Sequence, residues 1–254
     1  MILAIDAGNT NVVFSIFTGN NKIVDWREET KKNFSSDDWF VWLNQLMKVE
    51  KIDLESINKV VIACVVPPLL PKLEFISKEY FNCDPIVIQK NADLGIDILI
   101  DQPEIVGADC LANTVAAKIY YSTPAIIVDF GTATTFDIVD GLGNYYGGVI
   151  IAGVNLSIDA LHSISPVLPN IDFIKPKKVI GNDSISAMQS GIYWGYISKV
   201  EGIIKKIKRE FGSKMNVIAT GGFASVFSED FSLIDIVDKD LTLKGLLEVS
   251  KRSK

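Results

Sequence analysis

The chain has little of what several common kinds of active site need. Its 254 residues include one histidine and three cysteines, and no Cys-x-x-Cys pair occurs. A Ser-His-Asp triad or a two-histidine metal site needs more than His162 supplies, so this histidine is expected to be structural. The odd number of cysteines argues against a disulfide framework or a zinc site and favours a reducing compartment.

Other absences limit the partners and the location. A formal net charge of −6 disfavours nucleic-acid binding, because such domains usually present a basic face; the basic cluster Lys205–Arg209 has the spacing of a solvated helix face. No apolar run approaches the ~20 residues of a membrane helix, and no basic region precedes the apolar N-terminus as in a signal peptide. We therefore expect a cytoplasmic protein without nucleic-acid or membrane partners. No Gly-x-x-x-x-Gly-Lys-Ser/Thr motif occurs, which excludes a P-loop nucleotide site.

What is present is organised around an N-terminal turn, Asp6-Ala7-Gly8-Asn9-Thr10-Asn11. Apolar and β-branched residues on both sides predict a strand, a tight turn and a second strand. Gly8 and the Asn residues tolerate positive φ, so the backbone could curl and direct several N–H groups at one point. Such a turn suits a phosphate, and Asp6 could contribute through a divalent cation or its water shell. For an isolated motif, an ordinary hairpin turn is the alternative.

The same pattern returns half a chain later. Residues 127–139 again read as strand, Asp129-Phe130-Gly131-Thr132 turn and strand, and a Gly-Asn turn and a third strand follow each hairpin. Two copies imply a duplicated α/β domain, expected at about 1–120 and 121–254, with a cleft between the halves that holds a nucleotide. The first half reads β-β-β-α-β-α-β.

Helices are expected in several places. One begins at Ser35-Ser36-Asp37-Asp38, and another follows Asp109 with Leu111, Val115 and Ile119 on its inner face. A short helix is expected at about 155–162, and the longest at 184–211. The longest contains Gly191, Gly195 and Gly202, which lower helix propensity and would be explained by a close helix crossing, either within the chain or at a dimer interface.

Six motifs in order resemble the actin-like ATPase superfamily of ribonuclease-H-like folds, and within it the type III pantothenate kinases. They are Asp6–Thr10, Val65-Val66-Pro67, Gly107-Ala108-Asp109, Asp129–Thr134, Gly147–Ile150 and Ala219-Thr220-Gly221-Gly222. The resemblance implies two ribonuclease-H-like domains with the active site in the cleft between them. It also implies ATP-dependent phosphorylation of pantothenate to 4'-phosphopantothenate, the first step of coenzyme A biosynthesis.

The resemblance further implies cofactors and assembly. Mg²⁺ would accompany ATP through water near Asp6, and a monovalent cation, K⁺ or NH₄⁺, would bind at Asp129. The expected assembly is a homodimer whose substrate pocket is completed across the interface, with the helix 184–211 as the contact. The residues implied for ATP and its phosphates are Asp6, Ala7, Gly8, Asn9, Thr10, Asn11, Val12, Val13, Gly131, Thr132, Thr134, Thr220, Gly221 and Gly222.

Asp109 has two interpretations. Its place near a helix N-terminus is that of a simple cap or dipole-stabilised carboxylate. The resemblance instead implies the base that takes the hydroxyl proton of pantothenate as this hydroxyl attacks the γ-phosphate of ATP, which suits phosphoryl transfer. The residues implied for the pantothenate site are Ile100, Gly107, Ala108, Asp109, Cys110 and Ser184.

The sequence departs from the family pattern within this site. Cys110 stands where the family has Arg, Ile100 where it has Tyr, and Ser184 where it has Thr. Without the Arg, a bidentate clamp on the substrate carboxylate is lost, which predicts weaker binding. Two alternatives therefore stay open: a catalytically weakened member with a regulatory or interaction role, and a related kinase of another small hydroxyl substrate.

Overall fold

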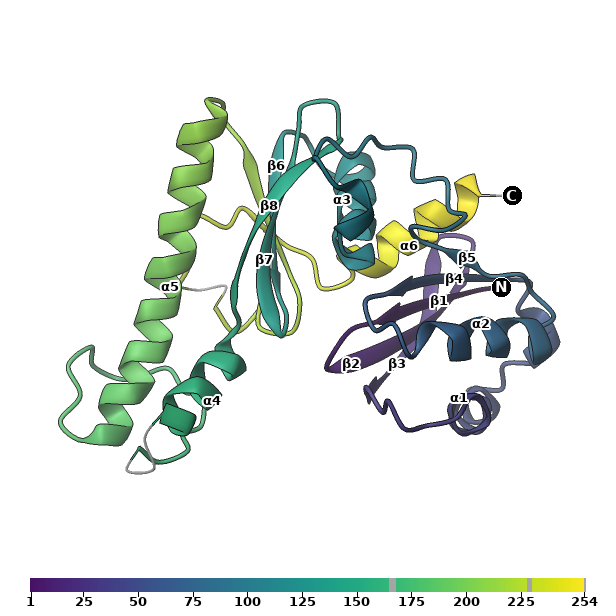
Figure 1. Ribbon diagram of the computed structural model, residues 1–254, viewed down its shortest axis with the longest axis horizontal. Coiled ribbons are helices and arrows are strands. Elements are labelled where there is room, and N and C mark those ends of the chain that lie inside the picture. Colours follow the sequence, from purple (N-terminus) through teal and green to yellow (C-terminus); the bar gives the residue numbers. More distant parts are fainter. Residues whose placement is uncertain (165–167, 228–229, 254) are drawn as a thin grey trace. The chain divides into compact units, whose positions relative to one another are not determined.

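The computed structural model describes residues 1–164, 168–227 and 230–253, and the chain divides into two compact units (Figure 1). The first unit comprises Met1–Tyr121, Gly143–Tyr145 and the C-terminal segment from Asp240. The second comprises Ser122–Leu142 and Tyr146–Lys239. Each unit contains most or all of one five-stranded sheet.

The sheet of the first unit has the strand order β3-β2-β1-β4-β5. β1 pairs antiparallel with β2 and parallel with β4, and β4 pairs parallel with β5. The elements of this part of the chain are β1 (Ile2–Ala7), β2 (Asn11–Thr18), β3 (Asn21–Glu29), α1 (Ser36–Val49), η1 (Leu54–Ser56), β4 (Lys59–Cys64), α2 (Leu70–Glu79), β5 (Ile86–Val87), η2 (Pro103–Ile105), α3 (Ala108–Tyr120) and α6 (Leu241–Arg252).

Helices cover both faces of this first sheet (Figure 1). Successive side chains of a strand point to opposite faces, so Leu3 and Ile5 pack with α1 and α2 whereas Ala4 packs with α3 and α6. Helix α6 crosses α3 closely, because a Cβ on Gly245 would lie 1.9 Å from the carbonyl oxygen of Ala112. The C-terminal helix therefore belongs to the core of the first unit.

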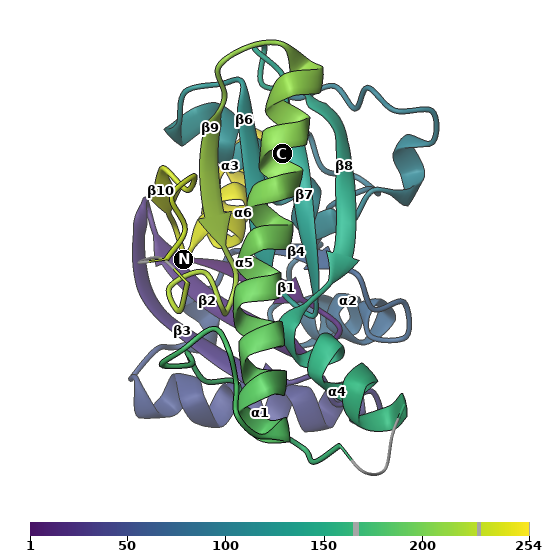
Figure 2. The ribbon, with the colours of Figure 1, turned by 90° about the vertical axis from the view of Figure 1, so that its left-hand side faces the viewer.

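The second sheet repeats the topology of the first, with the order β10-β9-β6-β7-β8. β6 takes the central place of β1, antiparallel to β7 and parallel to β9. Figure 2 shows the long helix α5 running along one face of this sheet. The elements are β6 (Ala125–Phe130), β7 (Ala133–Val139), β8 (Tyr145–Ala152), α4 (Val154–Ile164), α5 (Ser184–Phe211), β9 (Asn216–Thr220) and β10 (Ile236–Val237).

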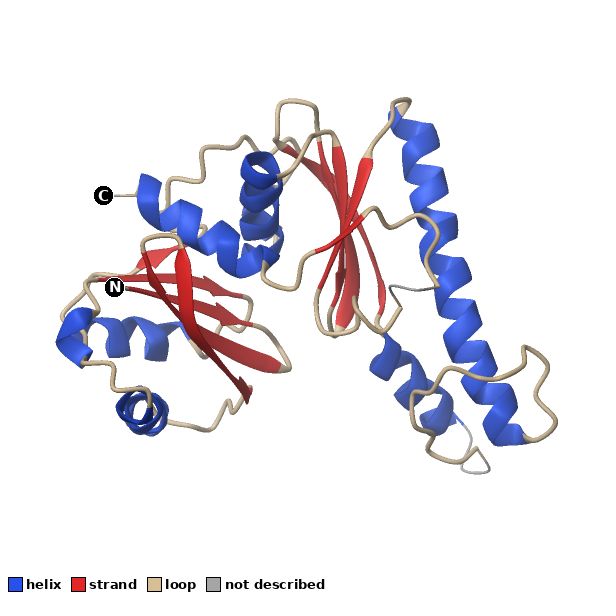
Figure 3. Cartoon of the chain, turned by 180° about the vertical axis from the view of Figure 1, so that it is seen from behind, coloured by secondary structure: helices blue, strands red, loops and turns tan. Residues whose placement is uncertain are grey.

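The predicted α/β class with a duplicated domain is confirmed, because the strands form two separate sheets with corresponding strand orders (Figure 3). Helix α1 begins as predicted, because Ser35 and Asp38 form a capping box, and α5 has the predicted bounds. The inner-face prediction for Ile119 is wrong, because its side chain is 38% exposed near the end of α3. The division into 1–120 and 121–254 stays a prediction.

Glycines in α5 do not mark a crossing within the chain. A Cβ at Gly191, Gly195 or Gly202 would meet no atom within 4 Å among the described residues. These glycines and the exposed Ser184, Ala187 and Ser198 line one face of the helix at three- and four-residue spacing. Packing inside the chain therefore gives no reason for them.

Other predictions concern absences and single residues. All three cysteines are free, as predicted. His162 is exposed near the end of α4, where its Nδ1 lies 2.9 Å from the carbonyl oxygen of Leu168, a local structural contact. Within the described ranges, no helix combines the length and apolar character that a membrane span requires.

Candidate active site

The first turn, residues 8–11, connects β1 to β2 beyond the closing pair Ala7 and Val12. The Gly8 N–H donates to the carbonyl oxygen of Asn11 at 2.9 Å. Thr30, just after β3, holds the turn from the side: its hydroxyl donates to the Gly8 carbonyl at 2.6 Å, and its N–H donates to the Thr10 carbonyl at 2.9 Å. Asn9 and Thr10 remain exposed at the tip.

The turn does not use the positive φ that Gly8 and the Asn residues tolerate. Residues 8–11 all have negative or extended φ values. Gly8 is instead suited to the turn by its size, because a Cβ there would lie 3.2 Å from the carbonyl oxygen of Asn11. The turn reverses the chain through its own hydrogen bond and those from Thr30, and not through a left-handed residue.

Asp6 lies one residue before the end of β1 and is half-buried. It is paired in register with Ala63 of the parallel strand β4, and the Val65 N–H extends this pairing by donating to the Ala7 carbonyl at 3.0 Å. Ligands of open α/β sheets commonly bind where the carboxyl ends of parallel strands meet. Burial, with a smaller contribution from Asp6, raises the pKa of the Cys64 thiol at the same edge, so this cysteine stays protonated and unreactive.

Asp109 is the second residue of α3 and is half-buried. Its Oδ1 accepts the N–H of Cys110 at 2.9 Å, so the carboxylate folds back over the start of the helix. A Cβ on Gly107 would lie 2.3 Å from that oxygen. A Cβ at residue 107 would displace the Asp109 carboxylate from this position, which gives a physical reason for the Gly-x-Asp spacing.

The residues around Asp109 form a mainly apolar wall. Val106, Ala108 and Leu111 are buried in one hydrophobic cluster that also contains Val13. Ile100 and Cys110 are partly buried against the same cluster. The structure thus brings Val13, near the start of the chain, into one cluster with the residues around Asp109. Ile100 and Cys110, which depart from the family pattern, both pack against this cluster.

The second turn, residues 131–133, connects β6 to β7 beyond the closing pair Phe130 and Thr134, and it is one residue shorter than the first. Gly131 and Thr132 are exposed. The start of α4 lies directly against this turn, because the Gly153 N–H donates to the Thr132 carbonyl at 3.2 Å. A Cβ on Gly153 would lie 2.3 Å from the same oxygen, so the approach requires glycine.

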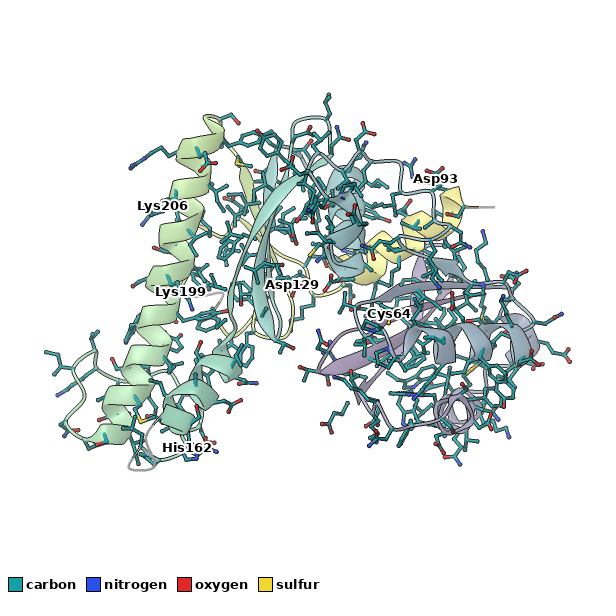
Figure 4. All side chains as sticks on the ribbon, viewed as in Figure 1. Cys64, Asp93, Asp129, His162, Lys199 and Lys206 are labelled. Atoms are coloured by element: carbon teal, nitrogen blue, oxygen red, sulfur yellow. The ribbon has the colours of Figure 1, made fainter. Side chains whose placement is uncertain are left out.

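Asp129 (Figure 4) precedes this turn near the end of β6. Asp6 precedes the first turn in the same way in β1. It pairs in register with Thr220 of the parallel strand β9. Gly221 follows with a φ of +87°, and a Cβ there would lie 2.4 Å from the Asp129 Oδ1 and 2.7 Å from the Phe130 nitrogen. Asp129, the second turn and the Thr220–Gly222 segment are therefore neighbours within the second unit.

Thr134 has its side chain in the core of the second unit. Its hydroxyl is fully buried and hydrogen-bonded to the hydroxyl of Tyr196 in α5. Burial, with a contribution from the Asp129 charge, raises the pKa of Tyr196 to about 12. The Thr134 hydroxyl is thus committed to α5, which leaves its backbone as the group that can meet a phosphate.

The predicted site residues fall into two groups, one in each unit. The first unit holds residues 6–13 and the predicted pantothenate residues other than Ser184. The second holds Asp129, the second turn, the Thr220–Gly222 segment and Ser184, which is exposed at the first position of α5. Thr30 was not predicted, because no local motif marks a threonine that contacts a turn 20 residues away.

Mg²⁺ at nucleotide sites usually keeps several water ligands and uses one or two carboxylates. In the part of the chain that the structure describes, no group of three or more His, Cys, Asp or Glu residues could form a metal cluster. Asp6 beside the first turn fits a metal bound through water to a phosphate. Asp129 lies close to Gly221.

Solved structures of low sequence identity share this fold. The chain matches a structure titled a conserved putative Baf family transcriptional activator from Campylobacter jejuni, with TM-score 0.60, 19% identity and 98% of each chain covered. It also matches a putative N-acetylglucosamine kinase from Porphyromonas gingivalis, with TM-score 0.53, 12% identity and 98% of each chain covered. The fold is that of the actin-like ATPases and sugar kinases.

Sequence comparison identifies the family within this class. The family model described as "Type III pantothenate kinase" matches residues 2–206. A type III pantothenate kinase of Paramagnetospirillum magneticum is 48% identical, covering 100% of this chain and 98% of the relative, and one of Caulobacter vibrioides is 45% identical over the same shares. The chain belongs to the type III pantothenate kinase family.

Proposed function

We propose that the protein transfers the γ-phosphoryl group of ATP to the hydroxyl of pantothenate, giving 4'-phosphopantothenate for coenzyme A biosynthesis in the cytoplasm. The observation that carries this proposal is the joint presence of two Asp-led turns and of Asp109 seated over Gly107 in a chain that covers 98% of a related type III pantothenate kinase. A chain that had lost phosphoryl transfer would have no chemical need for all three.

In this proposal each turn contacts phosphate through backbone N–H groups. The first turn presents Asn9 and Thr10, and the second presents Gly131 and Thr132, all exposed. The Thr220–Gly222 segment lies beside Asp129, where small residues admit the adenosine. Phosphoryl transfer depends mainly on alignment and charge stabilisation, which exposed backbone donors on a fixed sheet edge can supply.

Asp109 is assigned as the base. Its second oxygen does not take part in the hydrogen bond that Oδ1 makes with the Cys110 N–H, so it can accept the hydroxyl proton of pantothenate. The Cys110 N–H, at the N-terminus of α3, keeps the carboxylate oriented. Asp109 thus has a fixed position before substrate arrives.

Two cations are part of the proposal. Asp6 holds Mg²⁺ through water, and Asp129 holds K⁺ or NH₄⁺. The cations offset the negative charge of the phosphates. What supports the assignment is that each carboxylate ends a central strand next to a phosphate-type turn.

The pantothenate site lacks an arginine clamp. Cys110 and Ile100 offer a thiol and an apolar surface against the hydrophobic cluster. The substrate carboxylate therefore binds more weakly to these residues than it would to an arginine. We propose that this raises the KM for pantothenate more than it lowers kcat, because uniform binding affects KM. Ser184 supplies a hydroxyl from α5.

A homodimer through α5 is also proposed. The exposed face that carries Gly191, Gly195 and Gly202 leaves open space above the helix backbone, which permits close approach of a second helix. Sedimentation at micromolar concentration should give a species of twice the 27.9 kDa chain mass. A single-chain species alone would contradict the dimer.

The test of the function is ATP-dependent conversion of pantothenate, followed by product mass, for the wild type and for Cys110→Arg. We expect phosphopantothenate from both, with a lower KM for pantothenate in Cys110→Arg, by roughly tenfold for a charged hydrogen bond of about 1.5 kcal/mol. ATP binding without turnover in the wild type, restored by Cys110→Arg, would instead establish a weakened regulatory member. Turnover of another hydroxyl compound in place of pantothenate would establish a different substrate.

A further inference from the structure

Gln89 lies at the end of β5, where the chain makes a tight turn. The Ile88 N–H continues the parallel pairing by donating to the Ile62 carbonyl at 3.0 Å. The N–H groups of Lys90 and Asn91 then both donate to the Val87 carbonyl, at 3.1 and 3.2 Å. Gln89 therefore projects from a turn that is anchored to the sheet edge at which β1 and β4 also end.

The backbone of Gln89 is in the left-handed region, with a φ of +72°. A non-glycine residue adopts this conformation at a cost, and glycine would adopt it with less strain. The Asn91 side chain fixes the turn from both sides, accepting the Val87 N–H at 2.7 Å and donating to the Pro85 carbonyl at 3.1 Å. The chain thus has a glutamine at a position whose backbone conformation favours glycine.

The Gln89 side chain has a specific target. Its amide nitrogen donates to the carbonyl oxygen of Val106 and, at 3.4 Å, to that of Glu104. Both carbonyls belong to the short turn around η2 that leads directly into Gly107-Ala108-Asp109. Val106 is buried, whereas Glu104 and Ile105 are exposed, so Gln89 holds a segment that is only partly secured by packing.

We propose that Gln89 is a positioning residue for Asp109. Its amide ties the approach to α3 to the rigid end of β5, which fixes Gly107 and hence the carboxylate that folds over it. Gln89 acts through this segment and does not itself take a proton. The inference rests on the proposed function, since it gives Asp109 the role of base.

The test separates the effect of the Gln89 side chain from the effect of its backbone conformation. Gln89→Gly removes the amide and relieves the left-handed strain, whereas Gln89→Glu keeps the length but replaces the donor by an acceptor that repels both carbonyls. Asn82→Gly is the matched control, because Asn82 is also left-handed, with a φ of +50°, and follows α2 away from η2. The readouts are kcat, the KM values, the melting temperature and amide hydrogen exchange of residues 107–111.

We expect both Gln89 variants to lower kcat by roughly tenfold to a hundredfold, the range that follows from misplacing a catalytic group by about 1 Å. The KM for ATP should change by less than about twofold, because the described contacts of Gln89 include neither phosphate-type turn. Exchange at residues 107–111 should accelerate, while Gln89→Gly melts no lower than the wild type. Asn82→Gly should change none of the kinetic values.

Unchanged exchange at residues 107–111 in Gln89→Gly overturns the inference, and so does faster exchange with an unchanged kcat. A parallel fall of kcat and melting temperature in Gln89→Gly would show a purely structural role and also overturn it. If the wild type makes no phosphopantothenate, the proposed function fails and the catalytic role of Gln89 fails with it. The exchange measurement then still reports whether Gln89 holds the segment.

Discussion

The two turns share a sequence pattern and a place in the sheet, but different contacts support them. Residues 8–11 are held by hydrogen bonds from Thr30, the residue that follows β3. Residues 131–133 are held by close backbone approach, with Gly153 on one side and Gly221 beside Asp129. Side-chain hydrogen bonds can be lost without a clash, whereas a glycine contact cannot accept a Cβ, so the second turn should tolerate substitution less well.

The two copies of the repeated fold also differ in their helices. The helix α3, which follows β5 in the chain, begins with Gly107-Ala108-Asp109, whereas α6, which follows β10, begins at Leu241 with Asp240 before it and has no Gly-x-Asp step. Among the described residues between β9 and β10, no helix corresponds to α2 between β4 and β5, and residues 222–226 form turns. The base is thus expected from one copy alone.

The largest effect should come from removing the Asp109 carboxylate, which distinguishes the start of α3 from the start of α6. Asp109→Asn keeps the shape and the acceptor for the Cys110 N–H but cannot take a proton. We expect kcat to fall by roughly 10²–10⁴-fold with a nearly unchanged KM for ATP. Steady-state kinetics with product mass detection would measure it, and an unaffected kcat would remove Asp109 from the role of base.

The next effect compares glycines of the two turns. Gly221→Ala places a Cβ 2.4 Å from the Asp129 Oδ1 at a φ of +87°, whereas Gly8→Ala places one 3.2 Å from a single carbonyl oxygen. We expect the free energy of unfolding to fall by about 2–4 kcal/mol for Gly221→Ala and by less than about 1 kcal/mol for Gly8→Ala. Urea denaturation of both variants measures the difference. Equal losses would contradict the distinction drawn between the turns.

A third effect concerns the buried hydroxyl pair beneath the second turn. The pKa of Tyr196 is raised from 10.0 to about 12 in the folded protein. Because the pKa is higher in the folded protein, the stability that the neutral Tyr196 hydroxyl contributes is complete below pH 10. This stability is lost as the pH rises toward 12. The loss should reach about 2 kcal/mol. Unfolding midpoints between pH 9 and 12 should therefore fall more steeply for the wild type than for Tyr196→Phe; parallel curves would show that Tyr196 does not titrate in this way.

The smallest effect should come from the support of the first turn. Thr30→Ala removes the hydroxyl that donates to the Gly8 carbonyl. One such hydrogen bond contributes about 1 kcal/mol, so the KM for ATP should rise several-fold while kcat changes little. Thr30→Ser retains the donor and serves as the control. The prediction is wrong if both variants behave alike.

Much of this fold follows from local sequence. The hairpins are marked by apolar strands around Asp-x-Gly steps, and α1 by Ser35 and Asp38, because these signals act between near neighbours. The contacts that distinguish the turns join residues far apart, such as Thr30 to Gly8 and Gly221 to Asp129, and no spacing in the sequence announces them. The negative or extended φ of residues 8–11 has the same explanation, since Thr30, after β3, supplies hydrogen bonds that hold the turn.

The central claim is that both turns serve one nucleotide. Hydrogen exchange with increasing concentrations of a non-hydrolysable ATP analogue and Mg²⁺ tests this most directly. We predict protection of amides in residues 7–12, 130–135 and 220–223, with one common midpoint concentration. Protection of one turn alone, or of the two turns at clearly different concentrations, would contradict the account.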